Sequence, residues 1–135
     1  MIMSVKKNIL LIDDDEEMCD ELIEVLIDAG YNIDCVHNGT EGKNLILQRG
    51  YDLILLDIKL PGLTGYEVLK ATEGRTKEAK ILILTGRPMQ KDAEPGAQLT
   101  EEDREEENAL KLANGIINKP FDLEKILATI KQITL

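Results

Sequence analysis

Short apolar runs recur along the chain at the length expected of β-strands. They cover residues 9–12, 33–36 (with Asp34 inside), 53–56 and 81–84, and a shorter run covers 116–117. Runs that are apolar on both faces are typical of strands buried between two layers of helices. The pattern therefore predicts a parallel sheet covered on both sides.

The segments between these runs have the hydrophobic periodicity of helices. Residues 16–29 place apolar side chains on one face, and Gly30 is expected to end that helix. Thr64 can cap a short helix that continues through Lys70, whereas Asn38-Gly39 and Pro61-Gly62 are expected to form turns. After a predicted N-cap at Asp122, one stripe contains Leu123, Ile126, Leu127, Ile130 and Ile133. Alternation of strands and helices predicts a doubly wound α/β fold with helices on both faces of a five-stranded parallel sheet.

The longest interval between predicted strands contains an acidic insertion at about residues 87–107. Its first part is polar, carries Pro88, Pro95 and Gly96, and has no helical periodicity, whereas residues 101–114 are expected to form an acidic helix. Eight acidic residues and one arginine fall within 92–107, so most of the formal charge of −10 is local to this region. The negative charge argues against direct binding to nucleic acid or to an anionic membrane.

The remaining composition indicates a cytoplasmic protein. No apolar stretch approaches the roughly 20 residues of a membrane span, and the first apolar run is too short for a secretory signal. Cys19 and Cys35 lack the spacing of a zinc or redox motif, and we expect both to be reduced core residues. His37 has no predicted role.

Carboxylates follow two of the predicted strands. Asp13, Asp14 and Asp15 follow the first strand, and Asp57 follows the third. In a doubly wound sheet, ligands bind beyond the carboxyl ends of the strands, so Asp13, Asp14 and Asp57 would converge there if the first and third strands are neighbours. A hard divalent cation such as Mg²⁺ relieves the repulsion within such a cluster. Asp15 has a simpler alternative role as the cap of the first helix.

Two further polar residues are expected at the same edge of the sheet. Thr85 follows the fourth strand, and Lys119 follows the short fifth strand. A hydroxyl donor and an ammonium group, together with a metal ion, can neutralise phosphoryl oxygens. Because a carboxylate can act as the nucleophile and form an aspartyl phosphate, Asp57 is the candidate acceptor.

Four motifs in this order resemble the receiver domain of two-component response regulators. They are NILLIDDD (8–15), DLILLDIKLPG (52–62), ILILTG (81–86) and NKPF (118–121). The resemblance covers about residues 6–133 and implies the strand order 2-1-3-4-5, with no output domain expected in this chain. It also implies a cis peptide bond between Lys119 and Pro120.

The resemblance assigns a role to each site residue. Asp57 would accept a phosphoryl group from the phosphohistidine of a histidine kinase or phosphotransfer protein. Asp14, Asp57 and the backbone carbonyl of Lys59 would bind Mg²⁺ directly, and Asp13 would act mainly through water. Thr85 would hydrogen-bond the phosphoryl group, and Lys119 would pair with it.

The same resemblance implies how the domain acts. A receiver supports its own phosphoryl transfer and hydrolysis without being a dedicated enzyme, and it switches its interaction with a downstream protein or output domain. A homodimer is a further possible assembly of such a domain.

Some positions differ from the usual family pattern. Ile116 stands where an aromatic residue is usual, Gly42 stands where alanine is common, and the segment after Thr85 is about a dozen residues longer. Lys59 and Arg87 stand at positions that tune phosphoryl lifetime in the family, and we expect them to slow or reshape self-hydrolysis.

Two alternatives belong to other functional classes. Asp13-Asp14-Asp15 loosely resembles the nucleophile motif of haloacid-dehalogenase-type phosphatases, but Glu17 stands where that family favours threonine or valine. The second alternative is a receiver-like interaction module that works without phosphorylation, which Ile116 and the altered loop would suit.

Overall fold

The computed structural model describes residues 6–86 and 100–135, and it contains five strands and five helices that alternate along the chain. The strands are β1 (Asn8–Ile12), β2 (Asn32–Val36), β3 (Leu53–Asp57), β4 (Lys80–Thr85) and β5 (Gly115–Asn118). The helices are α1 (Glu16–Asp28), α2 (Gly39–Gln48), α3 (Gly65–Ala71), α4 (Glu101–Leu112) and α5 (Leu123–Ile133). All strand pairs are parallel, and their order is β2-β1-β3-β4-β5, as expected.

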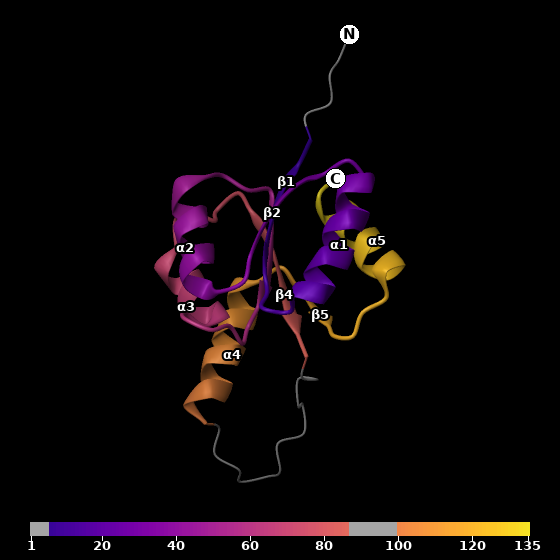
Figure 1. The fold of residues 1–135 in the computed structure, drawn as a ribbon. Helices are drawn as coiled ribbons and strands as arrows, with labels where there is room; N and C mark the ends of the chain where they lie inside the picture. The colour runs from indigo at the N-terminus through magenta and orange to yellow at the C-terminus, as the bar shows by residue number, and fades with distance from the viewer. Residues whose placement is uncertain (1–5, 87–99) are drawn as a thin grey trace.

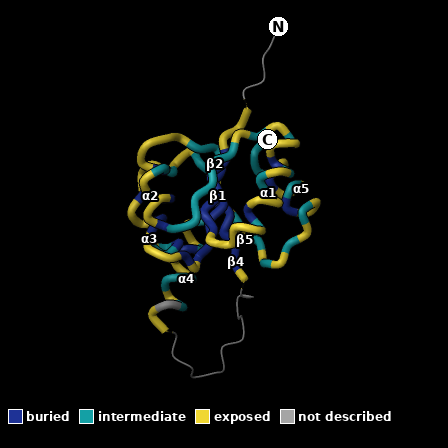
Figure 2. The backbone as a smooth tube through the Cα atoms, viewed as in Figure 1, coloured by how far each residue is buried: buried dark blue, intermediate teal, exposed yellow. Residues whose placement is uncertain are grey.

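Helices cover both faces of the sheet (Figure 1). α1 and α5 lie on one face, and α2, α3 and α4 lie on the other. Each face has its own apolar cluster of side chains from the strands and the covering helices. β1 and β3 are inner strands of the sheet and hold eight of the twelve largest fully buried side chains. Figure 2 shows buried backbone in dark blue at the centre of the molecule. This double coverage explains why the strand segments are apolar on both faces.

The helix starts are fixed by short polar side chains. Asp15 caps α1 by accepting a hydrogen bond from the Met18 N–H, and Asp122 caps α5 in the same way. Thr64 forms a capping box at α3 with Glu67. These caps satisfy backbone N–H groups that have no partner within the helix.

Most boundaries predicted from the sequence are confirmed to within two residues, and one turn prediction is wrong. Asn38-Gly39 was expected as a turn, but Asn38 caps α2 and Gly39 is its first residue. Asn is favoured both in turns and at helix N-caps, so this pair alone did not decide between them. Gly62 does lie in a loop, with a φ of 79°.

Gly42 allows α2 to approach the sheet closely. A Cβ atom at this position would lie 2.5 Å from Cδ1 of the fully buried Ile12. The helix therefore keeps a residue of poor helix propensity where an alanine would meet a packed side chain.

The acidic insertion is described only in its second part. α4 begins at Glu101 behind a capping box of Thr100 and Asp103, and it ends two residues before the predicted boundary. Ala109 is fully buried and anchors the helix to the sheet, while Glu101 and Glu107 are exposed. Residues 87–99, which include Arg87, Pro88, Pro95 and Gly96, lie outside the described residues.

Candidate phosphoryl-acceptor site

The carboxyl ends of four strands bring the predicted site residues to one edge of the sheet. Asp57 is the last residue of β3 and pairs with Leu84 of β4, so Thr85 lies one position beyond it on the neighbouring strand. Thr85 in turn pairs with Asn118 of β5, and Lys119 follows. Asp13 comes directly after β1, which pairs with β3 on the other side. The register of the parallel strands therefore assembles the site.

Three carboxylates form a compact cluster. Asp13, Asp14 and Asp57 each offer an oxygen, and these oxygens all lie within 4.8 Å of one another. Asp13 is fully buried and Asp57 is 7% exposed, whereas Asp14 is exposed. Burial, followed by repulsion from Asp13, raises the pKa of Asp57 to about 6, although Lys119 opposes this shift.

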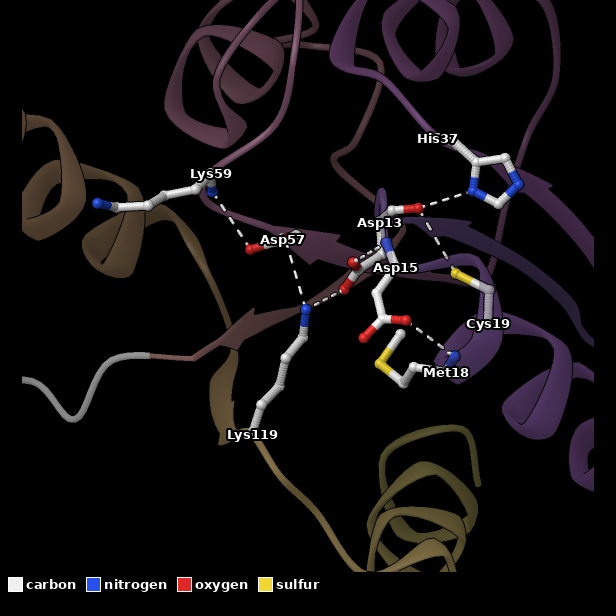
Figure 3. Close-up of polar contacts among 8 residues, drawn as sticks. All are labelled: Asp13, Asp15, Met18, Cys19, His37, Asp57, Lys59 and Lys119. Atoms are coloured by element: carbon white, nitrogen blue, oxygen red, sulfur yellow. Dashed lines mark hydrogen bonds and ion pairs between the residues drawn. The ribbon is translucent and has the colours of Figure 1, made fainter.

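Lys119 reaches into the cluster (Figure 3). Its ammonium group forms an ion pair with Oδ2 of Asp13 and lies 3.4 Å from Oδ2 of Asp57. Oδ2 of Asp13 has no hydrogen bond of ordinary geometry among the described residues, so this contact is ionic. Burial lowers the pKa of Lys119, but its interactions with the carboxylates of Asp13 and Asp57 outweigh burial and raise it. Lys119 is therefore held as a cation beside the carboxylates.

The backbone fixes the positions of the lysine and the acceptor. The Lys119 N–H donates to the Thr85 carbonyl at 2.7 Å, and the following Lys119–Pro120 peptide bond is cis, as expected. On the other side, the Lys59 N–H donates to Oδ1 of Asp57 at 3.2 Å. The Lys59 side chain extends away from the carboxylates in Figure 3. Thr85 is 7% exposed at the same strand edge.

The donor set fits a hard divalent cation. It consists of carboxylate oxygens, two of them on buried residues, and one buried oxygen has only an ionic contact with Lys119. Mg²⁺ prefers oxygen ligands and is commonly held by one or two carboxylates plus phosphate oxygens. The cluster can therefore hold Mg²⁺ at the point where Asp57 would react.

His37 is a neighbour of the site that the sequence interpretation missed. Its Nδ1–H donates to the Asp13 carbonyl at 2.8 Å, and Cys19 Sγ donates to the same oxygen at 3.5 Å. His37 follows β2, whose last residue pairs with Ile12, so the parallel register places it beside Asp13. The signal available from the sequence was the position of His37 directly after the second apolar run, at the same sheet edge as Asp13. Asp15 acts as a helix cap, as its simpler interpretation held.

Comparison with known proteins identifies the family. Residues 9–131 match the family model described as the response regulator receiver domain. The chain belongs to this family. It is a receiver domain of two-component signalling.

Named relatives and solved structures agree with this assignment. The receiver is 34% identical over 126 residues to an uncharacterized transcriptional regulatory protein, YkoG of Bacillus subtilis, covering 93% of this chain and 50% of that protein. It is 32% identical to DltR of Streptococcus agalactiae, with 91% and 50% covered. The chain thus spans about half the length of these curated relatives.

Two solved receivers have closely similar folds. A CheY-like receiver domain from Methanospirillum hungatei has a TM-score of 0.76 at 28% identity, with 95% of this chain and 93% of that chain covered. TrrA of Thermotoga maritima has a TM-score of 0.73 at 29% identity, with 94% and 98% covered, and its structure contains Mg²⁺ and BeF. The family thus includes Mg²⁺-binding members. No described helix of this receiver has both the length and the apolar character of a membrane span.

Proposed function

We propose that this receiver accepts a phosphoryl group on Asp57 from the phosphohistidine of a histidine kinase or phosphotransfer protein. One observation carries the proposal: the nearly buried Asp57 shares its pocket with two further carboxylates and with the Lys119 ammonium. An Asp57 oxygen attacks phosphorus and the phosphorus–nitrogen bond breaks. The imidazole leaves as a neutral ring because its other nitrogen has already taken up a proton from solvent. The product is an aspartyl phosphate.

Asp13, Asp14 and Asp57, with the backbone carbonyl of Lys59, are the residues that would hold Mg²⁺. The bound ion would supply positive charge beside the phosphoryl oxygens as negative charge redistributes. The carboxylate geometry supports this assignment, and the Mg²⁺ in TrrA is a precedent within the family.

Lys119 and Thr85 would stabilise the phosphorylated state. Lys119 already lies 3.4 Å from Asp57, and its ammonium can follow the charge onto the new phosphoryl group. Thr85 stands one register position beyond Asp57 and can donate a hydroxyl hydrogen bond from the neighbouring strand. Both residues come from strand ends, so their positions are set by the sheet.

Phosphorylation would then change the interaction with a downstream protein or output domain, in the cytoplasm. Ile116 on β5 is 42% exposed, and an aliphatic side chain there would make the response differ from that of receivers with an aromatic residue. A homodimer is one assembly that this switch could control. Self-hydrolysis would end the signal.

The rate of self-hydrolysis would depend on Lys59 and Arg87. Because the Lys59 side chain extends away from Asp57, its action on the attacking water requires a change of rotamer (Figure 3). Dephosphorylation rates of Lys59→Ala and Arg87→Ala, compared with wild type, test this role, and unchanged rates in both variants would exclude it.

Intact-mass spectrometry after treatment with a small acyl phosphate tests the main proposal. We expect one added phosphoryl group in Mg²⁺, none in EDTA, and none in Asp57→Asn. Asp52→Asn, at the opposite end of the same strand, is the matched control and should be labelled like wild type. Labelling that persists in Asp57→Asn but disappears in Asp13→Asn would instead identify Asp13, after the first strand, as the nucleophile. No labelling of wild type would favour a module that works without phosphorylation.

A further inference from the structure

Cys19 and Cys35 are brought together although sixteen positions separate them in the sequence. Cys19 lies on α1 and is fully buried, and Cys35 lies on β2 and is partly buried. Ligand atoms of Cys19, Cys35 and His37 all lie within 4.8 Å of one another. Both cysteines belong to the apolar cluster between the sheet and the layer of α1 and α5. The fold thus creates a pair of thiols that the sequence spacing did not indicate.

The surroundings distinguish the two thiols chemically. The interaction with Cys19, together with the attraction of His37, lowers the pKa of Cys35 despite its burial. Cys35 is therefore the more nucleophilic and the more accessible member, and Cys19 is its buried neighbour.

The same groups do not form a complete zinc site. A structural zinc ion takes four ligands, and the described cluster offers three. Nδ1 of His37 is already committed to the Asp13 carbonyl, and Nε2 lies 3.9 Å from a carboxylate oxygen of Glu16. The geometry favours chemistry between the two sulfur atoms.

We propose that Cys35 and Cys19 form a hydroperoxide-sensitive dithiol that closes to an intramolecular disulfide between β2 and α1. The Cys35 thiolate attacks the peroxide, its S–O bond forms, the O–O bond breaks, and the departing oxygen leaves as water or an alcohol. Cys19 sulfur then attacks Cys35 sulfur, the S–S bond forms, the S–O bond breaks, and the hydroxide leaves with the Cys19 proton as water. The two thiols lose two electrons and two protons, and the peroxide takes up both.

The packing is compatible with the second step. The sulfurs lie at most 4.8 Å apart, so reaching a disulfide length of about 2.0 Å closes a gap of less than about 3 Å. The disulfide would also remove the S–H donor from the Asp13 carbonyl, which Figure 3 shows beside the carboxylate cluster.

Peptide mass spectrometry of the native 135-residue chain tests this proposal. The chain is treated with hydrogen peroxide in EDTA, denatured, and alkylated to mark the remaining thiols. We expect a monomer that has lost two hydrogens, a Cys19–Cys35 cross-linked peptide, and full reversal by a dithiol reductant. Cys35→Ser should lose the cross-link and retain Cys19 as an alkylated thiol. In Cys19→Ala, dimedone should trap Cys35 as a sulfenic acid.

Several results would overturn the proposal. They are Cys35 oxidised beyond sulfenic acid in wild type while Cys19 remains alkylated, both thiols alkylated after peroxide, or disulfides only between chains. A stoichiometric zinc ion that protects both thiols would also overturn it. The decisive measurements use the wild-type chain, so they do not depend on how well the Cys19→Ala variant folds.

Discussion

Replacing Asp57 with asparagine should stabilise the metal-free protein, although it removes the proposed reactive group. The wild-type carboxylate is nearly buried and faces Asp13, and its pKa is raised from 3.8 to about 6 even with Lys119 nearby. An asparagine has similar shape and no charge, so it avoids the burial penalty and the repulsion. The structure therefore predicts that the Asp57 carboxylate lowers the free energy of unfolding when no metal is bound.

The pKa shift of Asp57 gives the magnitude of this destabilisation. A shift of roughly two pKa units corresponds to about 3 kcal/mol of unfolding free energy, at 1.36 kcal/mol per unit. The folded state binds the Asp57 proton more tightly than the unfolded state does, so Asp57 does not lower the unfolding free energy well below pH 3.8. The destabilisation grows as the pH rises from there to about 6, and it is constant at higher pH. The gain in Asp57→Asn should be about 3 kcal/mol at pH 7.5 and about half of that at pH 5.

Urea unfolding in EDTA and in Mg²⁺ measures this effect. A ligand at 100 times its dissociation constant adds about 2.7 kcal/mol to the stability of the state that binds it. Mg²⁺ should therefore stabilise wild type and close most of the gap to Asp57→Asn. Glu24→Gln, which removes an exposed carboxylate from α1, controls for the change in net charge and should have little effect. Asp57→Asn that is no more stable than wild type in EDTA at pH 7.5, or a gain independent of pH, would refute the reasoning.

The remaining predictions use the neighbouring contacts. Lys119→Ala leaves two buried carboxylates without their cation, so unfolding in EDTA should require about 3 kcal/mol less, and Mg²⁺ should restore part of the loss. Gly65→Ala would place a Cβ 2.6 Å from the Asp57 carbonyl oxygen, so it should weaken Mg²⁺ binding and lower the urea midpoint, whereas Gly50→Ala has open space and should change neither. Thr100→Ala removes half of a capping box and should cost about 1 kcal/mol, with faster hydrogen exchange confined to the first turn of α4. An unchanged midpoint in any of the three destabilising variants would contradict the contact it tests.

The sequence predicted the sheet well because its strands are buried on both faces. Such strands are continuous apolar runs, and the polar residue after each run marks the edge where the site forms. This rule places Asp13, Asp57, Thr85 and Lys119 at the same edge of the sheet, and the strand order decides which of them are neighbours. The strand order came from the family resemblance, since periodicity does not tell which strands are neighbours.

What the sequence did not predict depends on contacts between elements. Cys19 and Cys35 become neighbours only when α1 packs on β2, and a spacing rule for local motifs does not detect such a pair. His37 reaches the Asp13 carbonyl because β1 and β2 pair in one particular register. Asn38 was misassigned because its side chain suits a turn as well as a helix cap. In each case the deciding interaction is tertiary or depends on the conformation of a few residues.

The capping box at the start of α4 has a consequence for how this domain can diversify. Thr100 and Asp103 set the first residue of the helix through reciprocal hydrogen bonds, and Ala109 fixes the helix to the sheet. Fourteen residues separate Thr85 from Thr100, and each doubling of the number of residues between two anchors costs only about 0.6 kcal/mol in loop-closure entropy. Because neither anchor depends on that length, insertions and deletions before Thr100 can accumulate without moving the helix or the strand that ends at Thr85. This position is therefore where related chains can acquire new recognition segments, and where an inserted reporter peptide should be tolerated.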